Sequence, residues 1–361
     1  MKTMSGQITE KLQELLTVVI PHHGGERMLL DCLSSIEKSS QYLPQVLLVD
    51  NASPDDSVQK AKALYPWLKI LPSETNRGYA GGCNFGLAAV TTPYTLLLNN
   101  DVIVEPDCFD RLVERMEANL RLAAVQPKIR SYQNPELFDY AGAAGGLIDF
   151  DGIPFSYGRI LDVMEVDQGQ YDDVQQIFWA SGTAVVFRMS ALREVGTLEE
   201  SFFAHQEEID LCWRLWSAGW EVEAVPKAVI YHRGGATLNR SSNWKLYLNH
   251  RNSLAMWVRN AEYLTMLPVL RRVTLEIGAF GAYLSRGEIH RALHQVKAWR
   301  DFVSKLRITW SERKRLQALR KRSDDSFPGR YRGSVVWQFY FRRRRATAAF
   351  FRFDSTDRRG E

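Results

Sequence analysis

The chain has few cysteines and lacks a long apolar segment that is free of charge. No uncharged run reaches the roughly 18 residues that a membrane-spanning helix needs. The stretch MKTMSGQITEKLQELL has no apolar core of the kind found in signal peptides, so we do not expect export. The four cysteines are scattered, at Cys32, Cys83, Cys108 and Cys212, with no CxxC pair and no spacing typical of a disulfide framework. This indicates reduced thiols in a cytosolic compartment.

Two common nucleotide-binding motifs are also missing. Neither GxGxxG nor the Walker pattern with its lysine occurs, so the motifs support neither a dinucleotide site nor a P-loop. There are no internal repeats and no segments of low complexity. With 361 residues, 45% of them hydrophobic and 24% charged, the chain has the composition of a globular protein of one or two domains.

Negative charge is scarce near the C-terminal end. Residues 261–361 contain 23 Lys and Arg against 10 Asp and Glu, whereas residues 1–260 contain 23 against 32. This asymmetry indicates an anionic partner for the C-terminal region, either a membrane surface or a nucleic acid. No recognisable nucleic-acid module accompanies the arginines at 342–345 and the nearby Phe350, Phe351 and Phe353, so we expect no nucleic-acid partner.

The segment 263–284 is apolar but interrupted by charges. Arg271, Arg272 and Glu276 fall within it, so we expect it to lie on a bilayer rather than cross it. The basic residues that follow suit anionic lipids. A helical cap packed on the rest of the chain is the equally open alternative.

Strand and helix signals alternate in the first third of the chain. Short apolar runs at 15–21, 45–51, 68–73 and 94–98 predict buried strands, and helical patterns separate them. Further along, 178–188 and 221–233 indicate strands, 207–220 a helix, and the pattern is helical from 244 onward. We therefore predict an α/β fold with a mostly parallel sheet flanked by helices and a C-terminal helical extension.

Two aspartates follow predicted strands, at the sheet edge where ligands of such folds gather. The carboxylate of Asp50 could accept a hydrogen bond from a nucleotide base or ribose, or it could simply form a turn. Asn99-Asn100-Asp101 is either a polar turn or the place where one carboxylate holds a divalent cation whose other ligands come from a diphosphate. His232 could complete such a site, in which case Mn²⁺ is favoured over Mg²⁺, or it could be a structural histidine.

Two further segments carry possible chemistry. The glycine-rich stretch NRGYAGGCNFG at 76–86 opens a predicted helix and suits a phosphate-bearing ligand. The stretch HQEEIDLCWRL at 205–215 contains three carboxylates within four residues, at 207, 208 and 210. Crowded carboxylates raise one another's pKa, as in a general base, although an acidic first helical turn gives the same pattern.

Taken in order, these segments resemble a known family. The segments VDNAS, NRGYAGGCNFG, LLLNNDV, SGTAVVFR, FFAHQEEIDLCWR and YHRGG are similar to those of inverting family 2 glycosyltransferases with the GT-A fold. The resemblance is closest to the rhamnosyl- and galactofuranosyltransferases that build bacterial surface polysaccharides, and it covers residues 15 to about 255. It implies a glycosyltransferase domain at 15–258, an N-terminal extension at 1–14 and a basic, amphipathic helical region at 259–361.

The resemblance also implies roles for individual residues. Asp101 stands in the place of the family's DxD motif and would hold the metal ion together with His232. Glu208 falls where the family usually has an aspartate as catalytic base, which leaves Glu207 as a competitor, with Asp210 nearby. The acceptor would be bordered by Trp179, Ser181 and Gly182, and the donor would be contacted by Pro21, Asp50, Asn51, Asn76, Arg77, Gly78, Gly81, Gly82, Asn84, Asn99 and Asn100.

The implied reaction is a single displacement that inverts the anomeric carbon and depends on Mg²⁺ or Mn²⁺. The donor would be a nucleoside-diphosphate sugar, dTDP-rhamnose first and UDP-galactofuranose or a UDP-hexose next. The acceptor would be a glycan or a lipid-linked sugar, and the enzyme would be peripheral on the cytoplasmic face of the plasma membrane. The alternatives are a sugar nucleotidyltransferase, whose basic glycine-rich loop is not matched by PHHGGERM at 21–28, and a non-catalytic carbohydrate-binding or scaffold protein.

Overall fold

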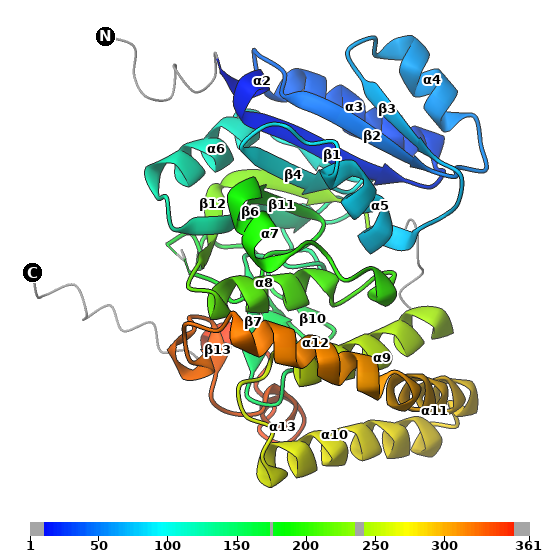
Figure 1. The fold of residues 1–361 in the computed structure, drawn as a ribbon, viewed down its shortest axis with the longest axis vertical. Helices are drawn as coiled ribbons and strands as arrows, with labels where there is room; N and C mark the ends of the chain where they lie inside the picture. Colours follow the sequence, from blue (N-terminus) through cyan, green and yellow to red (C-terminus); the bar gives the residue numbers. More distant parts are fainter. Residues whose placement is uncertain (1–10, 174–175, 235–241, 350–361) are drawn as a thin grey trace, which may run out of the picture.

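The computed structural model describes residues 11–173, 176–234 and 242–349. Figure 1 shows an α/β body in the upper half of the molecule and a layer of long helices, formed by the C-terminal part of the chain, in the lower half. Phe350, Phe351 and Phe353 lie outside the described residues.

An eight-stranded sheet forms the centre of the body, in the order β3-β2-β1-β4-β11-β6-β12-β5. Strands β1 (Leu16–His22), β2 (Gln45–Asn51), β3 (Lys69–Ser73) and β4 (Tyr94–Leu98) are parallel. β11 (Ala184–Arg188) runs antiparallel between β4 and β6 (Leu122–Ser131). β12 (Glu221–His232) is parallel to β6 and antiparallel to the short β5 (Val102–Val104).

Helices cover both faces of this sheet. α3 (Glu26–Ser39), α4 (Ser57–Leu64) and α6 (Cys108–Ala118) pack against the face that contains Val18 and Ile20. α5 (Gly78–Leu87), α7 (Met189–Val195) and α8 (Glu207–Ser217) pack against the face that contains Val19 and Val49. Because successive side chains of a strand point to opposite faces, a strand buried on both sides reads as a continuous apolar run, which is the pattern of 15–21 and 94–98.

A second, five-stranded sheet lies beyond the first. It has the order β10-β9-β8-β7-β13 and consists of β7 (Gly146–Asp149), β8 (Pro154–Ser156), β9 (Arg159–Ile160), β10 (Val163–Met164) and β13 (Arg330–Tyr331). β13 pairs in parallel with β7, so the C-terminal region adds a strand to a sheet that begins near residue 146.

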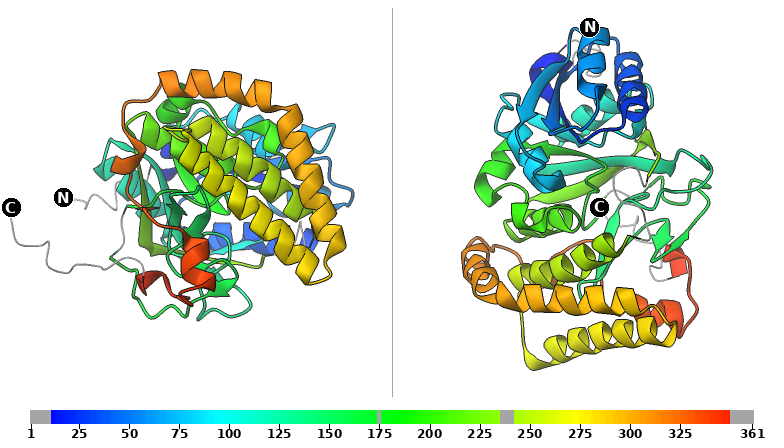
Figure 2. Two further views of the ribbon diagram at one scale, coloured as in Figure 1. Left: turned by 90° about the horizontal axis from the view of Figure 1, so that it is seen from below. Right: turned by 90° about the vertical axis from the view of Figure 1, so that its right-hand side faces the viewer.

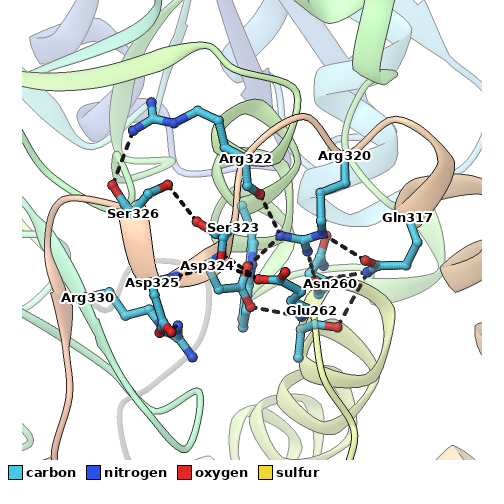
Figure 3. A network of polar contacts seen from close by, with 12 residues as sticks. Asn260, Glu262, Gln317, Arg320, Arg322, Ser323, Asp324, Asp325, Ser326 and Arg330 are labelled. Atoms are coloured by element: carbon cyan, nitrogen blue, oxygen red, sulfur yellow. Dashed lines mark hydrogen bonds and ion pairs between the residues drawn. The ribbon is translucent and has the colours of Figure 1, made fainter.

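The lower layer consists of α9 (Asn243–Asn260), α10 (Met266–Ser285), α11 (Ile289–Ser304), α12 (Leu306–Ala318) and the short α13 (Val335–Tyr340). Polar contacts tie the end of α12 to the end of α9 (Figure 3). Gln317 donates to the carbonyl of Asn260 at 3.1 Å, and Arg320 bonds Asp324 at 2.8 Å. Asp324 in turn accepts a hydrogen bond from the indole of Trp213 on α8, at 3.0 Å.

The predicted fold class is therefore confirmed, with one addition. The C-terminal region is helical and packs on the α/β body, and it also contributes the strand β13, which the sequence pattern did not indicate. None of the helices in the described residues is both long enough and apolar enough to span a bilayer. The division of the chain at residues 14 and 258 stays a prediction.

Candidate active site

The carboxyl ends of β1, β2 and β4 meet at one edge of the sheet, as the parallel topology requires. Asp50 lies there beside His22 in the strand register. Its Oδ1 accepts a hydrogen bond from the backbone N–H of Ser53 at 2.9 Å, which is the turn geometry that the sequence left open. The carboxylate is still partly exposed at the edge, so the turn does not exclude a contact with a ligand.

Asn51 organises the glycine-rich turn that precedes α5. Its Oδ1 accepts from the backbone N–H of Arg77 at 2.9 Å, and its Nδ2 donates to the carbonyl of Gly78 at 3.0 Å. Asn76 closes the same turn by accepting from the N–H of Gly78 at 2.9 Å. The exposed side chains of Asn76 and Arg77 therefore stand at the N-terminus of α5, while the buried Asn51 supports them from below.

The glycines of this segment have packing roles. Gly78 has a positive φ of 69°, and a Cβ there would lie 2.5 Å from Phe203. A Cβ on Gly82 would lie 3.2 Å from the amide of Asn51 and 3.3 Å from Pro21, so α5 approaches the sheet edge closely. Gly81 packs against Arg77. The glycines in this segment are therefore explained by the close packing of α5 as well as by space for a ligand.

Asn84 and Asn100 make contacts that give them structural roles. Asn84 exchanges hydrogen bonds with the backbone of Leu198, at 2.8 and 3.1 Å. Asn100 is buried and donates from Nδ2 to Nδ1 of His22 at 2.7 Å. The backbone N–H of Asn99 donates to the carbonyl of Thr183 at 3.0 Å. These bonds fix the end of β4 and do not require a donor contact from the amides.

His22 completes the network at this edge, and the sequence pattern gave no signal for it. Its Nε2 lies 2.7 Å from Oγ of Ser57, so the ring donates there and accepts from Asn100 as a neutral imidazole. Burial lowers the pKa of His22 to about 4, against the opposing charges of Asp55 and Asp50. Through these two hydrogen bonds, the neutral ring links β1 to α4 and to the end of β4.

Asp101 and His232 come together although 131 positions separate them in the chain. Oδ1 of Asp101 lies 3.2 Å from Nε2 of His232, and the backbone N–H of Arg233 donates to the carbonyl of Asp101 at 3.0 Å. The contact follows from the pairing of β5 with β12, which places His232 opposite Val102. Burial by itself would lower the pKa of His232, but the carboxylates of Asp101 and Asp139 outweigh it and raise the pKa to about 10.

The surroundings of Asp101 fit a divalent cation. Its Oδ1 is buried, and apart from the ion-pair contact with Nε2 of His232 at 3.2 Å it accepts no hydrogen bond, so a cation bound between the two side chains could replace that contact. Within the described ranges, no cluster of three or more His, Cys, Asp and Glu side chains is arranged to hold a metal ion. The chain would therefore supply Asp101 and His232, and the oxygens of a bound diphosphate would have to supply the remaining ligands.

Glu207 and Glu208 open α8 on the opposite face of the sheet from α3. Glu207 is buried, and burial together with the charge of Glu208 raises its pKa well above the ordinary value. Glu208 is partly exposed, and burial of its carboxyl raises the pKa to about 7 against backbone N–H groups that lower it. Each has a buried Oε2 without a hydrogen bond. Burial thus favours the protonated form of Glu207, whereas Glu208, with a pKa of about 7, has an ionised form near neutral pH that can accept a proton.

A strained turn presents this pair. Phe203, His205 and Gln206 have positive φ values of 66°, 70° and 76°, although none is glycine. Such backbone persists only where the surroundings hold it, and it is concentrated at functional sites. The sequence pattern did not reveal this turn.

Asn252 on α9 holds the strained turn. Its buried Nδ2 group lies 2.9 Å from the carbonyls of Phe202 and Ala204 and 2.8 Å from that of His205. Arg251 adds a bond to the carbonyl of Phe202 at 3.0 Å. Two neighbouring residues of α9 thus fix the backbone that leads into Glu207 and Glu208. In the sequence, the only indication of these contacts is the polar pair Arg251-Asn252 within a helical pattern.

Asp210 does not belong to the catalytic group that the sequence suggested. It is fully buried, and its carboxylate is bound by Arg214 at 2.9 Å, Arg259 at 3.2 Å and Asn260 at 2.6 Å. A fully buried carboxylate that is held by two guanidinium groups and an amide is not accessible to an acceptor hydroxyl. Its role is to join α8 to α9.

The segment 181–183 contacts both the end of β4 and helix α5. The carbonyl of Thr183 accepts from Asn99, two residues before Asp101. The carbonyl of Gly182 accepts from the hydroxyl of Tyr79. Burial raises the pKa of the Tyr79 hydroxyl well above its ordinary value, and Cys83, Glu207 and Glu208 act in the same direction. Ser181 is buried and donates to the carbonyl of Ala141 at 2.7 Å.

Trp179 packs in the core instead of lining an open site. It is 4% exposed, its indole N–H donates to the carbonyl of Leu147 at 2.8 Å, and it lies against Gly146.

A cavity of about 310 Å³ lies next to His232 and its neighbour Asp139. Its lining is mostly polar and includes Ser131, Gln133, Asn134, Asp139, Tyr140 and Arg233.

Comparison with known proteins gives a consistent result. Residues 17–196 match the family described as glycosyl transferase family 2. The N-acetylglucosaminyl-diphospho-decaprenol L-rhamnosyltransferase of Mycobacterium tuberculosis is 27% identical over 239 residues, which cover 61% of this chain and 76% of that protein. The pre-mycofactocin glycosyltransferase of the same organism is 26% identical over 256 residues, which cover 69% of this chain and 46% of that protein.

Solved structures show the same fold at low sequence identity. GalNAc-T7, crystallised with UDP, GalNAc and Mn²⁺, is 16% identical with a TM-score of 0.54, and the match covers 68% of this chain and 48% of that one. Residues 1–349 of S. aureus TarS, in complex with UDP-GlcNAc, are 14% identical with a TM-score of 0.54, and the match covers 84% and 83%. The fold is therefore the GT-A fold. The chain belongs to glycosyl transferase family 2 and is a glycosyltransferase.

Proposed function

We propose that the protein transfers a sugar from a nucleoside diphosphate to a hydroxyl group of a glycan or lipid-linked acceptor, with inversion at the anomeric carbon. The observation that carries this proposal is the presence of two incompletely bonded buried carboxylate sites, one at Asp101 and the other at Glu207 and Glu208. Asp101 with His232 offers one site for a cation, and the partly exposed Glu208 offers a base. Inverting transfer needs both of these functions.

The donor would bind along the sheet edge. Asp50 would accept a hydrogen bond from the nucleoside, and the exposed Asn76 and Arg77 would approach the diphosphate from the N-terminus of α5, where backbone N–H groups favour an anion. Asn51 would act indirectly, through the turn that it holds. Pro21 and the glycines at 81 and 82 would keep α5 close to this edge.

Asp101 and His232 would hold a Mg²⁺ or Mn²⁺ ion. Bound to the diphosphate, the ion would offset the negative charge that develops on the leaving group. The imidazole favours Mn²⁺, because nitrogen is a softer ligand than Mg²⁺ prefers. Asp139, whose Oδ1 lies 2.8 Å from Nδ1 of His232, would fix the orientation of the ring.

Glu208 would act as the general base. Its carboxylate takes the proton of the acceptor hydroxyl while that oxygen forms a bond to the anomeric carbon. The bond from the anomeric carbon to the diphosphate oxygen breaks on the opposite face, and the nucleoside diphosphate leaves with the electron pair. Glu207 would be less suited to take the proton, because its carboxyl is buried and burial favours its protonated form. Ser181 and Gly182 would border the acceptor through their backbone.

The donor sugar is the least constrained part of the proposal. The rhamnosyltransferase relative suggests dTDP-rhamnose first, with UDP-galactofuranose and UDP-hexoses next. The same relative acts on a lipid-linked sugar, as its name states, which suggests a lipid-linked acceptor and a working position at the inner face of the plasma membrane. Bacterial surface polysaccharide synthesis would be the corresponding process.

The test is a panel of nucleotide sugars incubated with the full chain, with and without EDTA. We expect one donor to release nucleoside diphosphate in a reaction that EDTA stops and Mn²⁺ restores, and Asp101→Asn to abolish it. Asp107→Asn is the matched control, because the aspartate at 107 is exposed and lies outside the site. Release of pyrophosphate would indicate a nucleotidyltransferase instead, and donor binding without any turnover would indicate a carbohydrate-binding protein.

A further inference from the structure

In helix α10, charged side chains are buried and apolar side chains are exposed, which is the reverse of the usual arrangement in a surface helix. A helix packed on a protein normally buries its apolar face and exposes its charges. In α10, which the structure describes in full, the buried residues are Arg272 and Glu276. Its exposed side chains are mainly Met266, Leu267, Val269, Leu270, Val273, Ile277 and Leu284, which are 39–86% exposed. The third charged side chain, Arg271, is 40% exposed and is paired with Asp151.

Buried charges hold α10 in this orientation. Arg272 donates to the carbonyl of Asp151 at 3.0 Å and to the hydroxyl of Ser253 at 2.7 Å. Glu276 accepts from His250 at 2.8 Å and from Trp299 at 3.0 Å. Burial would raise the pKa of Glu276, but His250 and Arg272 outweigh it and lower the pKa to about 2, so the carboxyl is ionised. Turning the apolar face inward would leave these charges unpaired, so the outward apolar face is fixed by the fold.

The short helix α13 extends the same face. The loop between β7 and β8 joins the two helices, because Asp149 accepts from the N–H of Val335 at 2.9 Å and Asp151 bonds Arg271 at 2.8 and 2.9 Å. Seen from below, α10 lies across the face with α13 beside it (Figure 2, left). α13 and the residue after it expose Trp337, Tyr340 and Phe341, each more than half exposed.

A run of arginines follows these aromatic residues. Arg342, Arg343, Arg344 and Arg345 are all exposed. An apolar surface beside aromatic and basic side chains has the composition of proteins that sit in the headgroup region of a bilayer containing anionic lipids. A second copy of the chain meeting this face about a twofold axis would offer these arginines no acidic partner, because the exposed residues of α10 and of 337–345 include none, whereas anionic lipids would.

We propose that the α10–α13 face, formed by the exposed residues of 266–285 and 337–345, docks the protein on an anionic lipid bilayer. The face gives the proposed position at a membrane a definite orientation. α9 links it to the active site, because His250 on α9 contacts Glu276 while Asn252 on α9 holds the turn before Glu208. The inference rests on the polarity of α10 and stands whether or not the proposed donor and base are correct.

The test is co-sedimentation of the full chain with vesicles of phosphatidylcholine alone or mixed with phosphatidylglycerol. We expect the chain to bind the mixed vesicles, and to bind the neutral vesicles at least about tenfold more weakly. Ile277→Glu and Leu270→Glu should each weaken binding by about tenfold or more, because a charge would enter the apolar layer. Replacing the four arginines at 342–345 by serine should remove the preference for anionic vesicles.

The matched control is Leu120→Glu, at a position that is 74% exposed on the α/β body. It should bind vesicles as the original chain does, and circular dichroism should show that all variants fold. Equal binding of Ile277→Glu and Leu120→Glu, or no binding to either vesicle, would overturn the proposal. So would a dimer in analytical ultracentrifugation that Ile277→Glu converts to a monomer, because a second copy would then cover the face. Hydrolysis of the donor in solution is read in parallel, so loss of vesicle binding is distinguished from loss of the proposed chemistry.

Discussion

The ring of His232 bridges to Asp139 on the side opposite Asp101. Nδ1 lies 2.8 Å from Oδ1 of Asp139, while Nε2 lies 3.2 Å from Oδ1 of Asp101. A carboxylate on the second nitrogen of a metal-binding histidine fixes the ring and makes it a better ligand. If His232 binds the proposed cation, Asp139 would position its ring, a role that only the tertiary structure reveals.

Replacing Asp139 by asparagine should weaken the binding of Mn²⁺ by about 10–100-fold, because the ring of His232 loses its charged partner. Titration of free Mn²⁺ by electron paramagnetic resonance, in the presence of nucleoside diphosphate, measures this without relying on activity. Asp162→Asn, at an exposed position, is the control. Unchanged affinity in Asp139→Asn would remove the positioning role.

Glu208→Gln should lower kcat by about 10²–10⁴-fold or more, because no group is left to take the acceptor proton, while the affinity for the donor is retained. In the original chain, kcat/KM should rise with pH through about 7, as the carboxyl of Glu208 loses its proton. Glu207→Gln should keep most of the activity. An active Glu208→Gln beside an inactive Glu207→Gln would reverse the assignment of the base.

The same carboxyl should also influence stability. Burial raises the pKa of Glu208 from 4.5 to about 7, so its favourable contribution is complete below pH 4.5 and is lost as the pH rises through 7. Glutamine does not titrate, so the Tm of Glu208→Gln relative to the original chain should increase between pH 5 and pH 8. We expect a gain of roughly 1–2 kcal/mol at pH 8, allowing for partial exposure. Glu74→Gln, at an exposed position, should show no such trend in calorimetry.

Asn252→Ala should lower kcat more than it changes KM for the donor. Loss of three carbonyl contacts frees the strained turn at 203–206, and Glu208 is then no longer held against the acceptor. Asn249→Ala removes a single bond to the side chain of Gln206 and should have a smaller effect. Steady-state kinetics on both variants tests this. A parallel fall in kcat for the two would argue for a general loss of structure.

The parts of the fold that could be predicted are those whose local pattern agrees with their final environment. The runs at 16–22 and 94–98 are apolar because both faces of the sheet are covered, so β1 and β4 could be recognised from composition alone. The same reasoning placed Asp50 and Asp101 at one sheet edge. The second sheet could not be predicted, because strands as short as Arg159–Ile160 have no periodicity to detect.

The errors at the site have a common cause. Asp210 was grouped with Glu207 and Glu208 by proximity in sequence, but it lies two positions after Glu208, on nearly the opposite side of the helix, where it contacts Arg214 and Arg259. Trp179 and Asn84 are likewise committed to distant backbone groups that the sequence does not reveal. The composition of α10 correctly indicated an apolar helix, but it did not reveal which side of the helix is buried. Charged residues in a helix ordinarily indicate its exposed side, whereas in α10 the buried residues are Arg272 and Glu276.

The most direct test of the proposed mechanism is the configuration of the product, followed by nuclear magnetic resonance during transfer from the donor that the panel identifies. The account predicts a new glycosidic bond of opposite anomeric configuration to the donor, formed only with a divalent cation and absent in Glu208→Gln, which still binds the donor. A product that retains the donor's configuration, or full transfer by Glu208→Gln, would contradict it.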